Sequence, residues 1–108
     1  MNSMETPVLE PILAERSLEY HDPDRGCQRV RVLLGMPREC ADEENWYCPF
    51  QIVGIGLEPV RAIYGIDAFQ CLQLVMKVIG ATLYSLSAQG SRLSWLDGPV
   101  GDFGFPWE

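Results

Sequence analysis

The chain is short of positive charge and of the residues that hold metal ions. Its 108 residues include 8 Lys and Arg against 15 Asp and Glu, a formal net charge of −7. Because that charge repels phosphate backbones, we expect no nucleic-acid partner. The single histidine, His21, is distant in sequence from the 4 cysteines, and no C-x-x-C pair occurs. This spacing excludes the common zinc sites, so we expect neither a metal nor any other cofactor.

Catalytic and nucleotide-binding motifs are also absent. Gly54 and Gly56 form a G-x-G that lacks a third glycine and precedes a turn rather than a helix. Glu43 and Glu44 are adjacent, so on any regular element they point apart and make a poor acid–base pair. A Cys/His enzyme would need a cysteine beside His21, which lies among ordinary turn residues. We therefore expect a protein that is not an enzyme and has no catalytic residues.

Long hydrophobic runs and export signals are missing as well. Residues 1–11 have no basic segment, and no run approaches the roughly 18 apolar residues of a membrane span. We expect a cytoplasmic protein with no membrane contact and with reduced thiols. Residues 1–11 also contain two prolines and no periodicity, which indicates a flexible N-terminal arm ahead of a single domain over residues 12–108.

What the chain does contain is one complete helix start signal. Asp67 is followed three residues later by Gln70, the spacing of a capping box, while Ile66 and Cys71 stand at the positions of a hydrophobic staple. The helical pattern then continues without proline to about Leu86. We predict one long helix over residues 68–86.

This helix has more apolar surface than one sheet face can cover. On a helical wheel its polar residues gather on a narrow arc, and the apolar arc spans about 200°, against about 100° for an ordinary surface helix. Either the aromatic C-terminal segment of the chain or a second subunit must shield the remainder. Self-association as a homodimer is therefore one expectation.

Alternating apolar and polar residues predict four strands before the helix and a fifth after it. Arg16 interrupts the apolar row of the first strand, which places it near an edge. Pro49 lies in the third strand and predicts an edge or a bulge, because proline cannot donate to the ladder. The predicted strands cover residues 12–20, 27–36, 46–55, 60–64 and 92–96.

These elements predict an α+β fold in which an antiparallel meander of four to five strands packs against the helix of residues 68–86. The strands are short and punctuated by glycines, so a strongly bent sheet that closes into a small Sm-like barrel is the alternative. Such a barrel would bind nucleic acid only if its arginines gathered on one face despite the negative net charge. The arginines concerned are Arg16, Arg25, Arg29, Arg31 and Arg38.

Two parts of the chain are candidates for binding a protein partner. One is the acidic loop before the third strand, whose carboxylates would pair with a basic surface. The other is the aromatic C-terminal segment, where glycines argue against regular structure and aromatic rings argue against free exposure to water. The candidate partner-binding residues are Glu39, Asp42, Glu43, Glu44, Trp95, Phe103, Phe105 and Trp107.

Several segments together resemble a family of small uncharacterised bacterial domains. The resemblance rests on W-Y-C-P-F at residues 46–50, Y-G-I-D at 64–67, L-S-W-L at 93–96 and G-F-P at 104–106. It extends over most of residues 12–106. Because that family has no established activity, the resemblance implies a bacterial cytoplasmic α+β domain and no mechanism.

The hypothesis that these observations favour is a non-catalytic protein-interaction module of an immunity-like or regulatory kind. A small-molecule enzyme with a pocket between the sheet and the helix is kept as an alternative, because such pockets need few polar groups.

Overall fold

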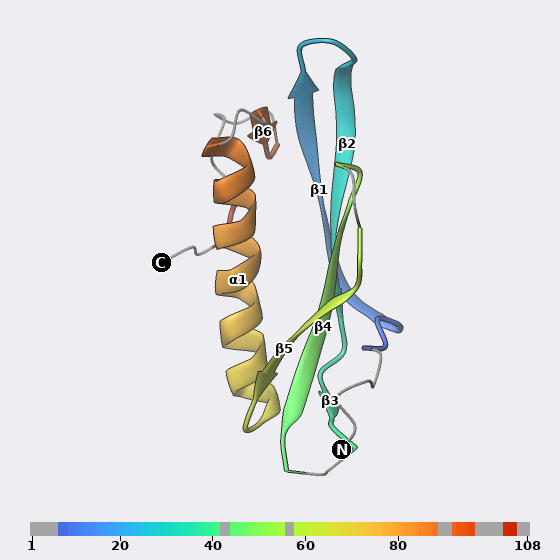
Figure 1. Cartoon of the computed structure of the whole chain (residues 1–108), viewed down its shortest axis with the longest axis vertical. Coiled ribbons are helices and arrows are strands. Elements are labelled where there is room, and N and C mark those ends of the chain that lie inside the picture. The colour runs from blue at the N-terminus through green and yellow to red at the C-terminus, as the bar shows by residue number, and fades with distance from the viewer. Residues whose placement is uncertain (1–6, 42–43, 56–57, 89–91, 97–102, 106–108) are drawn as a thin grey trace.

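The computed structural model describes residues 7–41, 44–55, 58–88, 92–96 and 103–105. In this part of the chain, six strands form one antiparallel sheet and a single helix lies across one face of it (Figure 1). The predicted α+β fold is confirmed. The elements are β1 (Ile12–Asp22), β2 (Gly26–Gly35), β3 (Arg38–Glu39), β4 (Trp46–Val53), β5 (Arg61–Gly65), α1 (Ala68–Ala88) and β6 (Arg92–Ser94).

The sheet is open, and the helix connects its two edges. β2 lies between β1 and β4, β5 pairs with the other edge of β4, and β6 returns to pair with β1. β3 continues the line of β2, because both pair with β4 in registers that differ by one residue. Among the described strands, β5 and β6 do not pair with each other. The structure therefore has the predicted layered sheet and not the alternative Sm-like barrel.

Pro49 lies inside the sheet, opposite a break in the neighbouring ladder. β4 pairs on both edges, and its pairing with β2 stops at Leu34 and resumes in β3 at Arg38. The sequence predicted either an edge or a bulge at Pro49, and the structure places this proline at a bulge. A Cβ atom at Gly35 would collide with the Leu9 carbonyl and lie 2.7 Å from the Pro49 ring, so only glycine fits there.

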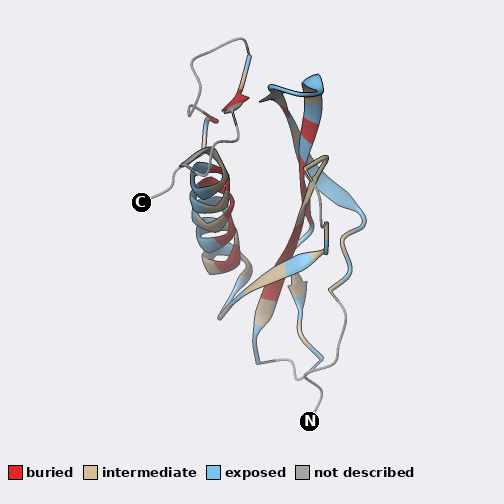
Figure 2. Ribbon diagram, turned by 45° about the horizontal axis from the view of Figure 1, so that its top comes forward, coloured by how far each residue is buried: buried red, intermediate tan, exposed pale blue. Residues whose placement is uncertain are grey.

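The core lies between the inner face of the sheet and one stripe of α1. Every fourth residue of the helix is buried, and Figure 2 shows this stripe facing the strands. It packs on alternate residues of β1, β2 and β4, which point to the same face because side chains alternate along a strand. The stripe consists of Cys71, Val75, Ile79 and Leu83, and its sheet partners are Leu18, Val30, Val32, Leu34, Cys48 and Phe50.

By length and composition alone, Ala68–Leu86 is also apolar enough to cross a membrane. The same composition is typical of the core helix of a globular domain, and the buried stripe of α1 is used in that way.

The predicted capping box starts the helix. Asp67 Oδ1 accepts a hydrogen bond from the Gln70 backbone N–H at 2.8 Å, and Gln70 Oε1 accepts one from the Ile66 N–H at 2.8 Å. Two N–H groups at the start of the helix are thereby satisfied. The helix itself runs to Ala88, two residues past the predicted end.

Residues 7–11 lie on the outer face of the sheet, away from α1. The Val8 N–H donates to the Tyr47 hydroxyl at 3.2 Å, and the Met36 N–H donates to the Pro11 carbonyl at 3.3 Å. The Arg38 guanidinium donates to the Glu10 carbonyl. Tyr47 is only 4% exposed although it points to this outer face. The flexibility of residues 1–11 stays a prediction, and residues 1–6 lie outside the described part.

We expect Asp67→Ala to lower the free energy of unfolding by about 1 kcal/mol, because the Gln70 N–H in the first turn of the helix loses its side-chain acceptor. Asp67→Asn is the matched control, since asparagine caps about as well as aspartate. Urea unfolding of the three proteins measures the difference. Equal stability of wild type and Asp67→Ala would contradict the capping role.

Candidate functional site

The residues predicted to bind a partner do not form one surface. Glu39 and Glu44 are exposed near the turn between β3 and β4, at the bottom of Figure 1, whereas Trp95 follows β6 at the opposite end. Asp42, Glu43 and Trp107 lie outside the described residues. Phe103 is buried in the core and Phe105 packs beside it. The described aromatic residues of the C-terminal segment therefore pack within their own chain.

Arg16 of β1 holds this C-terminal segment. Its guanidinium carbon lies 3.9 Å from the centre of the Trp95 ring and 4.6 Å from that of Phe105. Its Nη1 donates to the backbone carbonyls of Phe103, at 3.1 Å, and Gly104, at 3.0 Å. Cation–π contacts and charge-assisted hydrogen bonds thus act on the same cation. We call these five residues the Arg16 clamp.

The clamp explains why a charged residue interrupts the apolar row of β1. Arg16 shares the inner face with Leu18, and β6 pairs with β1 only at Glu19 to His21. The edge of β1 beside Arg16 is therefore unpaired within the described strands, in agreement with the predicted edge position. Across that edge the guanidinium reaches the C-terminal carbonyls.

The sequence also raised a Cys/His site at His21, and the hairpin does place a cysteine opposite it. Cys27 is the cross-strand partner of His21, and its thiol donates to Glu19 Oε2 at 3.5 Å. Partial desolvation raises the pKa of the Cys27 thiol, and the Glu19 carboxylate raises it further. A nucleophilic cysteine needs a lowered pKa. The sequence contained a signal for the pairing of His21 with Cys27, because the turn at residues 22–26 sets the register between β1 and β2.

His21 is itself engaged by a different group. Its Nε2 lies 3.3 Å from the hydroxyl oxygen of Ser94, while Asp22 accepts hydrogen bonds from the N–H groups of Asp24 and Arg25. The Asp22 carboxylate therefore stabilises the turn and does not orient the imidazole. Within the described residues, no group of three or more His, Cys, Asp or Glu side chains is placed to hold a metal ion.

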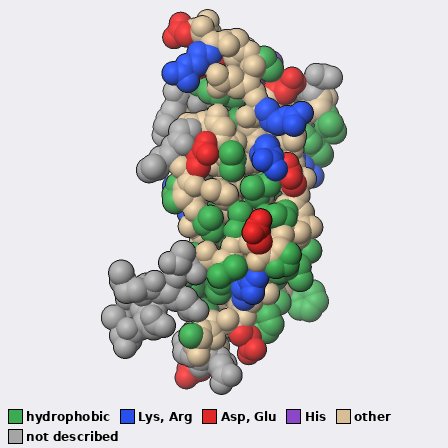
Figure 3. Space-filling model, turned by 90° about the vertical axis from the view of Figure 1, so that its right-hand side faces the viewer, with side chains coloured by type: hydrophobic (Ala, Val, Ile, Leu, Met, Phe, Trp, Pro, Cys, Tyr) green, Lys and Arg blue, Asp and Glu red, His purple; other side chains and the backbone are tan. Residues whose placement is uncertain are grey.

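The arginines required by the nucleic-acid alternative are distributed over different parts of the structure. Arg16 lies on the inner face, whereas Arg29 and Arg31 lie on the outer face of the sheet. Arg31 Nε is paired with Glu15 Oε2 at 2.7 Å. Figure 3 shows side chains of both charges mixed with hydrophobic ones over this outer face. Arg38, opposite Tyr47, also lies on the outer face, so Arg29, Arg31 and Arg38 share that face and Arg16 does not.

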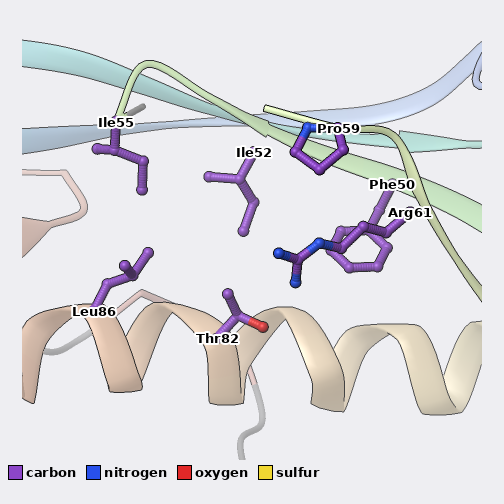
Figure 4. A pocket seen from close by; sticks show the side chains of 7 residues that line it. All are labelled: Phe50, Ile52, Ile55, Pro59, Arg61, Thr82 and Leu86. Atoms are coloured by element: carbon purple, nitrogen blue, oxygen red, sulfur yellow. The ribbon is translucent and has the colours of Figure 1, made fainter. Parts of the chain in front are cut away.

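A pocket of about 130 Å³ lies between the sheet and the second half of α1 (Figure 4). Aliphatic and aromatic side chains form most of its wall. Arg61 of β5 points its guanidinium into the space between the strands and the helix, toward Thr82. The lining residues are Phe50, Ile52, Ile55, Pro59, Arg61, Thr82 and Leu86. The sequence left a pocket between these layers as an alternative and gave no signal for Arg61.

Arg61 is the one charged side chain among the described residues that line this pocket. The Thr82 hydroxyl donates to the Val78 carbonyl at 2.8 Å, so its proton is already used. Glu58, the nearest acidic residue along the chain, accepts a hydrogen bond from the Gly54 N–H. Within the described residues, no carboxylate or carbonyl oxygen accepts a hydrogen bond from the Arg61 guanidinium. The pocket therefore combines an apolar wall with a cation that has no described protein partner.

All 4 cysteines are free thiols, as the sequence predicted. Burial raises the pKa of the Cys48 thiol to about 11, with a smaller effect from Cys71, whereas Cys27 is exposed. Cys71 is also buried, and desolvation raises the pKa of its thiol.

At about pH 8 we expect iodoacetamide to alkylate Cys27 in the folded protein and to leave Cys48 unmodified, because only an accessible thiolate reacts. Peptide mass spectrometry measures the two extents. Denaturant should make all four cysteines reactive. Equal labelling rates for Cys27 and Cys48 in the folded state would contradict this assignment.

Arg16→Met should destabilise the protein by about 1–3 kcal/mol, because it removes the cation–π contacts and both charged hydrogen bonds. Arg29→Met is the matched control, since Arg29 is exposed on the outer face. Urea unfolding gives the energies, and amide hydrogen exchange at residues 103–105 should accelerate in Arg16→Met alone. Unchanged exchange there would mean that Arg16 does not hold the segment.

Comparison with known proteins adds a family and no activity. A search of curated proteins and a search of solved structures give no match. One family model, described as a domain of unknown function (DUF6968), matches residues 14–107. This confirms the resemblance to an uncharacterised domain family that the sequence motifs indicated. The match covers nearly the whole chain, and the protein therefore belongs to the DUF6968 family of domains of unknown function.

Proposed function

We propose that the domain is a non-catalytic protein-interaction module that pairs with a second copy of itself through the outer face of α1. The observation that supports this proposal is the apolar surface that the helix keeps in water. Phe69 is 79% exposed, and Met76 and Tyr84 continue the same stripe along the helix. Ile66, just before the helix, is 70% exposed. Large apolar side chains gathered in this way are typical of protein-binding surfaces.

The charge of this face also favours a second copy. The protein has a net charge of −7, yet α1 contains no acidic residue and one basic residue, Lys77. Elsewhere on the surface two copies would repel each other through their carboxylates. On α1 that repulsion is absent, so this is the face by which two acidic chains can approach.

The spacing of the stripe suits a twofold axis. Phe69 and Tyr84 are equally distant from the midpoint between Met76 and Lys77, and they lie about 22 Å apart along the axis at 1.5 Å per residue. In an antiparallel pair of helices, Phe69 of one copy would meet Tyr84 of the other at both ends. Such a self-complementary arrangement is what a twofold interface requires.

The described aromatic residues of the C-terminal segment lie away from this face. Phe103 and Phe105 pack against the core at the Arg16 clamp, not along the Phe69 stripe. The wide apolar arc of the helix needs cover either from the aromatic C-terminal segment or from a second subunit. The described aromatic residues of that segment cover the region of the Arg16 clamp instead. A second copy supplies the other shield. An immunity-like or regulatory role is the kind of activity that such a module would serve.

Sedimentation equilibrium over a range of concentrations tests the proposal. The wild-type mass should rise from 12.2 kDa toward twice that value, and Phe69→Glu should keep the mass near 12.2 kDa, since a charge would be buried at the interface. Ser17→Glu, on the exposed outer face of the sheet, is the matched control and should associate like wild type.

Either of two outcomes would overturn the proposal. One is a wild-type protein that stays monomeric at the highest concentration. The other is a Phe69→Glu variant that associates as strongly as wild type. Circular dichroism of each variant confirms that the fold is retained, which is expected because Phe69 packs little in the monomer.

A further inference from the structure

We propose that the pocket between β4, β5 and α1 binds a small organic monoanion: a carboxylate carried on a compact apolar body. The body would occupy the apolar wall, and the carboxylate would bind the Arg61 guanidinium. This inference does not depend on the pairing of two copies, because the pocket and the outer face lie on different sides of α1.

The size and lining of the pocket determine the apolar body. Its volume is about 130 Å³, and an engineered apolar cavity of about 150 Å³ in another protein holds benzene. Phe50, Ile52, Ile55 and Leu86 give it a wall without hydrogen-bonding side chains. The Thr82 hydroxyl proton is bound to the Val78 carbonyl, so the helix side offers no further donor. A ring or short branched chain of about five to eight non-hydrogen atoms fits such a space.

The Arg61 guanidinium determines the charge of the ligand. It points into the pocket in Figure 4, and no described residue accepts its hydrogen bonds. A guanidinium presents a planar fork of N–H donors that matches the two oxygens of a carboxylate. Arg61 is exposed, so its guanidinium can exchange water for the carboxylate while the body of the ligand lies on the apolar wall. The free side of Arg61 therefore selects an anion.

The surrounding charge limits that anion to a single negative charge. Among the described lining residues Arg61 is the only cation, whereas the protein as a whole has a net charge of −7. A phosphate dianion would be repelled by this field and left with only part of its charge compensated. A carboxylate needs one partner, and Arg61 is sufficient for it.

Benzoate is the probe, because its ring fills the pocket and its carboxylate can reach Arg61. Backbone amide chemical shifts of the full chain are followed as benzoate is added to about 10 mM, above the millimolar Kd expected for so small a ligand. The shifts should concentrate at Phe50, Ile52 and Leu86. Three control ligands should bind at least about tenfold more weakly than benzoate. Benzamide lacks the negative charge, acetate lacks the apolar ring, and inorganic phosphate is not a monoanion on an apolar body.

Arg61→Met should weaken benzoate binding by at least about tenfold while the fold is retained, because Arg61 is exposed and methionine keeps an apolar stem. Arg29→Met, on the outer face of the sheet, is the matched control and should bind benzoate like wild type. Circular dichroism and the amide spectrum of each variant check the fold directly.

Three results would each overturn the proposal. The first is the absence of benzoate-induced shifts at the pocket in wild type, which would mean that the stem of Arg61 only covers the apolar wall. The second is equal binding of benzoate to wild type and Arg61→Met. The third is acetate or phosphate binding as tightly as benzoate, which would leave the apolar wall without a role.

Discussion

The structure depends on the burial of one apolar sheet face under one stripe of a single helix. An antiparallel sheet of this kind is stable in water only when its apolar face is covered, and Val75, Ile79 and Leu83 supply that cover at intervals of four residues. Because the stripe is narrow, the helix needs only part of its circumference for the core. The opposite arc is left outside with Phe69 and Tyr84 on it. The position of α1 on the sheet thus decides both which helix residues form the core and which apolar residues stay exposed.

The same packing accounts for the pocket. A straight helix follows a twisted sheet closely over only part of its length, so space opens where the two diverge. Here that space lies between the second half of α1 and the end of β4, and the chain lines it with Ile52, Ile55 and Leu86. Arg61 enters from β5 on the inner face, in the register set by its pairing with Phe50. Because Arg61 pairs with Phe50 across β4 and β5, its guanidinium lies beside the apolar side chains of the pocket.

Two inward-pointing arginines show how partners decide the role of a charged residue. Arg16 and Arg61 both interrupt apolar rows on the inner face of the sheet. Arg16 is satisfied within the protein by two aromatic rings and two backbone carbonyls, and it holds the C-terminal segment. Arg61 has no such partner in the described part of the chain. A cation held by protein groups supports the fold, whereas Arg61 is exposed to solvent and can exchange water for an external anion.

The sequence by itself determined most of the local elements: the helix from Asp67, its capping box with Gln70, and the alternating strands other than β3. These depend on interactions within a few residues or on a repeating period, and such signals can be read along the chain. Only the tertiary structure decided the contact of Arg16 with Phe103, which are 87 residues apart, and the convergence of Arg61 with Thr82 and Leu86. It likewise showed that the acidic loop and the aromatic segment lie at opposite ends. No local pattern encodes which distant residues meet, because that depends on the path of the helix across the sheet.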